Sequence, residues 1–154
     1  MQITAFDLAQ RYVGIKEISG TKNHPLVSWW LSLCGFPMDT PDETAWCSAF
    51  VNGIAWELRL PRSKSAAARS WLMVGVPTSL TNAVPGFDVV ILKRGETGSP
   101  GQQGPEVLNA PGHVGLFAGK QNTSHIAVLG GNQGDSVSIG LFPTTSVLGI
   151  RRLA

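Results

Sequence analysis

The sequence lacks the features that mark several large classes of protein. It has two cysteines and no CxxC pair, which excludes a disulfide framework and gives no support to a zinc or redox motif. Its net charge of +2 is too small to indicate a nucleic-acid-binding protein. No apolar run approaches the roughly 20 residues of a membrane-spanning helix, and the N-terminus has neither the basic nor the apolar region of a signal peptide. We therefore expect a soluble chain with free thiols that is made in the cytoplasm.

What the chain does have is enough apolar residues for one core, and many turn-forming residues. Hydrophobic residues make up 43% of its 154 positions, and it has 18 glycines and 10 prolines, so we expect one domain over residues 1–154. Helical periodicity and capping residues predict helices within 3–14, 24–36, 42–58 and 63–75. Short β-branched runs between turn residues predict about five strands, at 86–93, 112–119, 125–131, 136–142 and 147–153. A helical half (1–76) followed by a sheet half (86–153) indicates an α+β fold with an antiparallel sheet.

A long segment rich in glycine and proline, residues 94–112, separates the first two predicted strands. Compact domains seldom keep so long a loop without structure unless it serves a site. A tolerated surface insertion is an equally good interpretation of this segment from the sequence alone.

Cys47, near the start of the third predicted helix, has two interpretations. It shares one helical face with five apolar residues, which favours a buried core position: Phe50, Val51, Ile54, Ala55 and Leu58. If Thr44 caps the helix, however, Cys47 lies in the first turn, where free N–H groups would lower the thiol pKa and hold an oxyanion. A rival capping box that begins at Thr40 would place Cys47 a turn further in. Cys34, late in the second helix, is expected in the core.

A cysteine nucleophile needs a base, and the base needs a group that fixes its orientation. His24 precedes a proline in a polar turn and is expected to be a surface or capping residue, and His125 opens an apolar strand. His113 lies at the start of a strand just after the long loop, so its side chain can project from the end of the sheet. Asn132, at the end of the next strand, would lie beside it if these strands pair antiparallel. Asp135 is a weaker candidate because it falls in the turn.

Several stretches, in this order and spacing, resemble the papain-like cell-wall hydrolases, namely the NlpC-type peptidases and the CHAP group (cysteine, histidine-dependent amidohydrolase/peptidases). These stretches are "DETAWCSAFV", "PGFDVVIL", "GHVGLFAG" and "VLGGNQGDSVSI". A single-domain subgroup common in phages also shares "KEISG", "ARSWL" and "LGIRR". The resemblance runs from about residue 5 to the end of the chain.

The resemblance implies a papain-like fold and a role for three side chains. Cys47 would be the nucleophile, His113 the general base and then acid, and Asn132 the group that orients the imidazole. It also implies that the cysteine stands at the N-terminus of a helix, where the backbone N–H groups of Cys47 and Ser48 would hold the oxyanion. The reaction would be amide hydrolysis through an acyl-enzyme.

The same resemblance implies bacterial peptidoglycan as the substrate, with no metal or cofactor. The bond cut would be either the one between muramic acid and L-alanine or one within the stem peptide. Glu17, Trp46 and Trp71 would flank the cleft as substrate contacts.

In this family a single catalytic domain without a signal peptide resembles phage endolysins. Such an enzyme is made in the host cytoplasm and reaches the cell wall or periplasm through holin pores, and we expect it to be monomeric. A virion-borne enzyme and a secreted effector amidase fit the same features. A reading from another class is a catalytically silent module that binds cell-wall peptides, and a Cys/His zinc protein is disfavoured because the sequence has so few suitably spaced ligands.

Overall fold

The apolar runs in the second half of the chain form one antiparallel sheet in the computed structural model, which describes residues 1–154. The strands are β2 (Asp88–Lys93), β3 (Gly112–Lys120), β4 (His125–Gly130), β5 (Ser138–Pro143) and β6 (Val147–Arg152). A further short strand, β1 (Val76–Thr78), pairs with β6, and the sheet order is β1-β6-β2-β3-β4-β5. The predicted α+β class with an antiparallel sheet is confirmed, although the sheet has six strands rather than about five.

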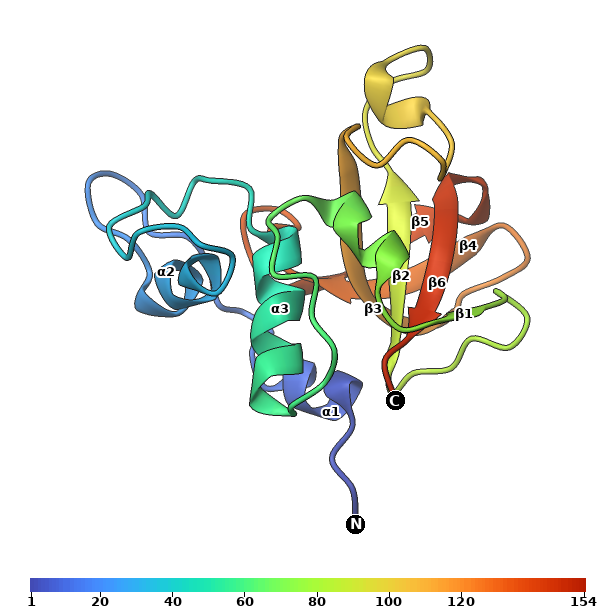
Figure 1. The fold of residues 1–154 in the computed structure, drawn as a ribbon, viewed down its shortest axis with the longest axis horizontal. Helices are drawn as coiled ribbons and strands as arrows, with labels where there is room; N and C mark the ends of the chain where they lie inside the picture. The colour runs from blue at the N-terminus through green and yellow to red at the C-terminus, as the bar shows by residue number, and fades with distance from the viewer.

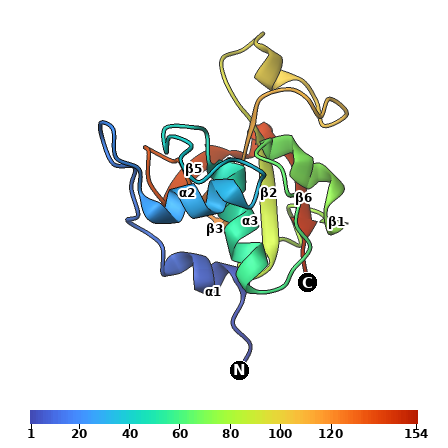
Figure 2. The same ribbon diagram turned by 60° about the vertical axis from the view of Figure 1, so that its left-hand side comes forward.

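Three helices lie on one side of this sheet, two of them against its strands and the other against one of these helices (Figures 1 and 2). They are α1 (Ala5–Gln10), α2 (Pro25–Ser32) and α3 (Cys47–Glu57). The predicted capping box of α1 is present, with Thr4 and Asp7 bonded to each other's backbone N–H groups, and His24 caps α2 through its ring nitrogen. None of these helices has the length and apolar character needed to cross a membrane.

Helix α3 is the centre of the core between the sheet and α2. All its residues from Cys47 to Ala55 are buried, so the helix is enclosed on every side rather than along one stripe. Gly53 allows this, because a Cβ at that position would overlap the indole ring of Trp30 on α2. The N-terminus of α3 points toward the end of the molecule where loop 94–112 stands (Figure 1).

The predicted fourth helix, 63–75, is wrong in type and extent. Only Ala68–Met73 is helical, as a 3₁₀ turn (η1). The preceding segment is held by side chains instead: the buried Asn52 accepts from the Lys64 N–H and donates to Ser63 Oγ. These bonds replace the helical ones, and Lys64 takes a left-handed backbone angle of φ 57° that no helix contains.

Loop 94–112 is organised around one buried cation. The guanidinium of Arg69, on η1, is fully buried and has no acidic partner. Each of its five N–H bonds can instead be directed at a loop carbonyl, those of Pro111 (3.0 Å), Gly104 (2.7 Å), Val107 (2.9 Å), Gly101 (3.0 Å) and Gln103 (2.9 Å). The loop is therefore a fixed part of the fold, with one short 3₁₀ turn at Pro100–Gln102.

We predict that Arg69→Met lowers the free energy of unfolding by about 2–4 kcal/mol, because five loop carbonyls lose their charged, buried donor. Chemical denaturation would measure the loss, and hydrogen exchange should accelerate within residues 100–111. Arg11→Met is a matched control at an exposed position, where a change within about 0.5 kcal/mol is expected. Equal stability of the two variants would contradict the role assigned to Arg69.

Candidate active site

Cys47 is the first residue of α3. The residue before it, Trp46, occupies the N-cap position and makes no side-chain capping bond, so neither Thr44 nor Thr40 caps this helix. The first backbone N–H groups of a helix have no acceptor within the helix. At this end the N–H groups of Cys47, Ser48 and Val114 all act on the Cys47 sulfur. The thiol therefore lies between the start of α3 and the start of β3.

Burial, not the helix end, dominates the acidity of this thiol. Cys47 is only 3% exposed, and burial raises its pKa although the surrounding N–H groups lower it. The expectation of a depressed pKa from the helix N-terminus is thus wrong in direction for the free protein. The N–H groups remain available to a negative charge that forms at the sulfur or beside it.

His113 lies at the start of β3, opposite Leu92 of β2. Its ring stacks on Phe142 at 5.4 Å between centroids, and its Nε2 is 2.9 Å from Gln133 Oε1. Burial lowers the pKa of the imidazole, and the Gln133 bond partly opposes this effect. Both His113 and Cys47 therefore favour their neutral forms.

The partner of the imidazole is Gln133, not the predicted Asn132. Asn132 takes a left-handed angle of φ 58° in the turn after β4, a conformation that asparagine tolerates well. It lines the same hollow as His113 but makes no side-chain hydrogen bond to it. The longer Gln133 side chain reaches the ring. Asp135, the weaker candidate, lies apart from His113 in a hollow with Glu17 and Glu43.

Gln133 fixes which imidazole nitrogen carries the proton. Its amide nitrogen donates to the carbonyls of Ser138 (2.8 Å) and Val128 (3.2 Å), so the amide oxygen must face His113. The oxygen can only accept, and His113 Nε2 must therefore be the protonated nitrogen. The other nitrogen, Nδ1, makes no hydrogen bond and keeps a free lone pair in the neutral ring.

The structure brings Cys47 and His113 to the same end of the sheet. The N–H of Val114, the residue next to His113, lowers the pKa of the Cys47 thiol, and the charge of Arg94 lowers the pKa of both groups. The two side chains are not hydrogen-bonded to each other. Such contacts are often long in free enzymes and shorten when substrate binds.

Two hollows open around this pair. One of about 430 Å³ includes His113, Gln133, Asn132 and Arg94 in its lining. The other, of about 310 Å³, is lined by Cys47, Arg94, alanines 66–68 and the end of loop 94–112. The long loop thus forms part of the wall next to the thiol, which favours the interpretation that it serves a site.

The predicted substrate contacts differ in accessibility. Trp46 and Trp71 are fully buried, so neither can touch a substrate in this conformation. Their indole N–H groups donate to Glu17 Oε1 (2.7 Å) and Ser48 Oγ (2.9 Å), which makes them core residues that brace α3. Glu17 lines an acidic hollow of about 280 Å³ with Glu43 and Asp135, and burial raises its carboxyl pKa.

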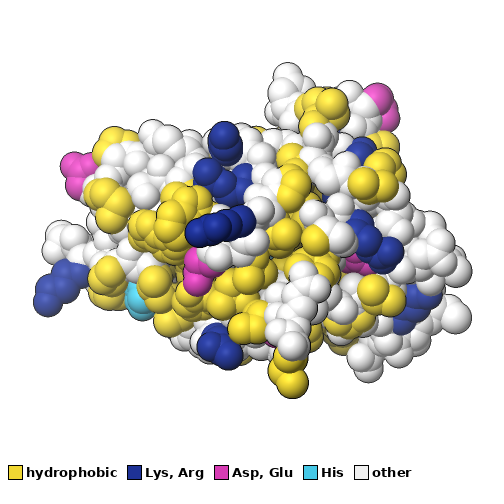
Figure 3. Space-filling view, turned by 60° about the horizontal axis from the view of Figure 1, so that its bottom comes forward, with side chains coloured by type: hydrophobic (Ala, Val, Ile, Leu, Met, Phe, Trp, Pro, Cys, Tyr) yellow, Lys and Arg dark blue, Asp and Glu magenta, His cyan; other side chains and the backbone are white.

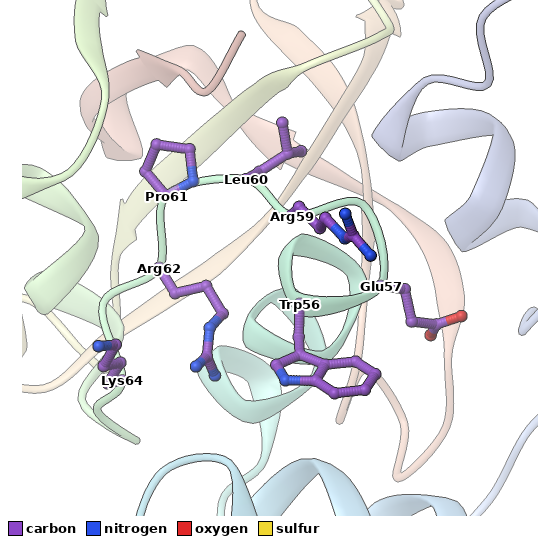
Figure 4. Close-up of a pocket in the computed structure, with 7 residues that line it drawn as sticks. All are labelled: Trp56, Glu57, Arg59, Leu60, Pro61, Arg62 and Lys64. Carbon is purple, nitrogen blue, oxygen red and sulfur yellow. The ribbon is translucent and has the colours of Figure 1, made fainter.

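The largest hollow is far from this chemistry. It measures about 810 Å³ and is lined by residues around the C-terminal end of α3, namely Trp56, Glu57, Arg59, Leu60, Pro61, Arg62 and Lys64 (Figure 4). On the face shown in Figure 3, which turns the bottom of Figure 1 toward the viewer, lysine and arginine side chains are spread among apolar side chains. This hollow contains no cysteine, serine or histidine, so size alone does not identify the active site.

The other histidines and Cys34 stand outside the site. His24 caps α2, and His125 Nδ1 is 2.9 Å from Ser124 Oγ at the start of β4. Cys34 is half-buried against the core, and burial raises its pKa to about 11.

Gln133 and Arg94 also line this site, and neither was predicted from the sequence. Gln133 follows Asn132 directly and is a second amide in the same turn, so its residue type could have marked it as a candidate. No feature of the sequence marked Arg94 as a site residue.

Comparison with known proteins supports the architecture. No protein-family model and no curated protein matches this sequence. The solved structure of NlpC1 from Trichomonas vaginalis superposes on 97% of this chain, with a TM-score of 0.55 and 18% sequence identity. The chain covers 42% of that structure, which is less than half of its length. The chain therefore has the papain-like fold of an NlpC-type protein.

Proposed function

We propose that this chain is a cysteine-dependent hydrolase that cleaves an amide bond of peptidoglycan. The observation that carries the proposal is the set of backbone N–H groups around Cys47, next to a histidine whose free nitrogen is fixed by Gln133. A nucleophile, a base with a defined tautomer and oxyanion donors are the three parts that thiol hydrolysis of an amide requires.

In the proposed reaction, His113 Nδ1 takes the proton of the Cys47 thiol as the sulfur attacks the substrate carbonyl. The N–H groups of Cys47 and Ser48 hold the oxyanion of the tetrahedral intermediate. His113 then gives its proton to the leaving amine, and an acyl group remains on Cys47. Water, activated by the same imidazole, releases the acyl group and restores the thiol. Gln133 keeps Nε2 protonated throughout.

Peptidoglycan as the substrate rests on the NlpC-type fold together with the motifs around Cys47, His113 and Gln133. Both cleavage positions, muramoyl-L-alanine amidase and stem-peptide endopeptidase, are compatible with an acyl-enzyme on Cys47. We further propose that the protein is a phage endolysin that acts as a monomer, made in the host cytoplasm and reaching the cell wall after holin-dependent release. This assignment rests on the motifs shared with single-domain phage lysins.

One observation favours a second candidate, a silent module that binds cell-wall peptides. Cys47 is almost completely enclosed, and its raised pKa and the lowered pKa of His113 keep both groups neutral. A binding module needs no reactive thiolate, so a neutral, enclosed thiol is compatible with it. Binding alone does not require a histidine whose tautomer is fixed by Gln133, and hydrolysis is therefore the leading proposal.

Replacing Cys47 separates the two candidates. We predict that Cys47→Ala abolishes the release of fragments from purified peptidoglycan, because no acyl-enzyme can form, while the protein stays folded. Mass spectrometry of the fragments from the unaltered protein would identify the bond: free stem peptides with N-terminal L-alanine mean amidase, and cuts within the stem mean endopeptidase. Cys34→Ala is the matched control and should remain active. Fragment release by Cys47→Ala would contradict the thiol mechanism. The absence of fragment release by the unaltered protein on a broad panel of peptidoglycans would contradict it as well.

The neighbouring amide side chains of Asn132 and Gln133 allow a test of which one orients the His113 imidazole. We predict that Gln133→Ala lowers kcat by about ten- to hundredfold, because the His113 tautomer is no longer fixed. Asn132→Gly removes the adjacent side chain without straining the left-handed backbone, and kcat should change by less than about threefold. Steady-state kinetics on one peptide substrate would compare them, and a larger loss for Asn132→Gly would return the role to Asn132.

The pH profile should reflect the lowered pKa of His113. The neutral imidazole is the base, so activity is lost as pH falls and the ring is protonated. Because the pKa of His113 lies below its ordinary value of 6.5, the midpoint of the acid limb of kcat/KM should lie below pH 6.5. Gln133→Ala should move this acid limb lower still, since the Gln133 bond raises the pKa. An acid limb above pH 6.5 in the unaltered protein would contradict a neutral resting pair.

A further inference from the structure

Arg94 stands at the point where the two hollows of the candidate active site meet. It follows the last residue of β2, whose partner in β3 is Gly112, so it lies beside the start of the strand that carries His113. It is the one residue that lines both the hollow of His113 and the hollow of Cys47. Its positive charge lowers the pKa of both the Cys47 thiol and the His113 imidazole, although burial has the larger effect on each.

The backbone of Arg94 is fixed although its side chain is not. Its N–H donates to the carbonyl of Gly101 at 3.1 Å, and a Cβ at Gly101 would overlap the Arg94 carbonyl. Gly101 is in turn held by the buried Arg69. The loop that Arg69 ties down therefore sets the position from which the Arg94 side chain extends.

The guanidinium of Arg94 has no partner in the protein. It is exposed, donates no side-chain hydrogen bond and forms no ion pair. Two other arginines of the chain are engaged within the protein: Arg69 is saturated by loop carbonyls, and Arg152 makes a bidentate ion pair with Asp88. Arg94 thus keeps its full set of planar donors, which suit a carboxylate bound through both oxygens.

The charges around the cleft are separated by sign. Neither hollow beside Arg94 is lined by an aspartate or glutamate, and Lys93 adds a second cation to the hollow of His113. The acidic side chains Glu17, Glu43 and Asp135 gather in a separate hollow. A ligand anion at Arg94 would therefore meet no opposing carboxylate.

We propose that Arg94 forms a carboxylate-binding subsite that selects peptides with a free carboxylate close to the bond that Cys47 attacks. This inference rests on the proposed function, since it names the substrate chemistry of the same site. In peptidoglycan the matching group is the free carboxylate of the γ-linked acidic residue in the stem peptide. Stem peptides in which this group is a carboxamide lack the negative charge and should bind more weakly than those with the free carboxylate.

The test compares two synthetic stem peptides that differ only at this group, one carboxylate and one carboxamide. Their affinities for the inactive Cys47→Ala protein, measured by calorimetry, should differ by about ten- to hundredfold in favour of the carboxylate, as for hydrogen bonds to a charged group. Adding Arg94→Gln to that protein should remove the difference by weakening only the carboxylate peptide. Arg59→Gln, which removes the same charge at the distant hollow, should leave the difference intact.

The same pair of peptides tested for hydrolysis by the active protein keeps the two proposals apart. A preference in both binding and kcat/KM, lost in Arg94→Gln, supports the subsite and the hydrolase together. A preference in binding with no hydrolysis of either peptide or of peptidoglycan supports the subsite and removes the hydrolase. Equal affinity for the two peptides, no binding of either, or a preference that survives Arg94→Gln overturns the subsite.

Discussion

The structure depends on the burial of α3, whose first turn meets the start of β3. A helix enclosed on all sides gains most of its stability from packing, so it can leave its N-terminus without a side-chain cap. An uncapped end costs about 1 kcal/mol, and here it leaves the N–H groups of Cys47 and Ser48 free at the thiol. The close contact of Gly53 with Trp30 fixes the depth of the helix, and that depth determines where Cys47 stands against Val114.

A second constraint is the buried Arg69, which holds the loop that lines the hollow beside Cys47. A cation without an acidic partner is stable in a core only when dipoles replace water around it, and the loop carbonyls supply these dipoles. The bonds tie η1 to residues 101–111 of the loop, from Gly101, whose carbonyl also accepts from the Arg94 N–H, to Pro111 next to the start of β3. The Cys47 hollow and the position of Arg94 thus follow from one side chain that touches neither the thiol nor the imidazole.

The sequence predicted the features that depend on local residue patterns. It did not predict the features that depend on how distant segments pack together. Periodicity gave three of the four predicted helices, five of the six strands and the α+β class, and motif order pointed to Cys47 and His113. The choice between Asn132 and Gln133 depended on the turn after β4, where Asn132 takes a left-handed backbone angle and the longer Gln133 side chain bonds both His113 and the sheet carbonyls. Trp46 and Trp71 were expected in the cleft because sequence gives residue type but not depth. The effect of burial on the Cys47 pKa was missed for the same reason, since a helix position does not reveal how much water reaches it.

Burial explains Cys47 as a core residue, but it does not explain the groups around it. A structural thiol needs no hydrogen-bond partner, whereas this one lies beside a polar chain that runs from two carbonyls through Gln133 to His113. Such a chain loses solvation on burial and is tolerated only when each member is bonded. The ring nitrogen of this chain without a hydrogen-bond partner is His113 Nδ1, on the strand whose first residues lie beside the neutral Cys47 thiol. Burial of Cys47 therefore accounts for its neutral state, whereas the bonded chain beside it is the feature on which the proposed role of His113 as a base rests.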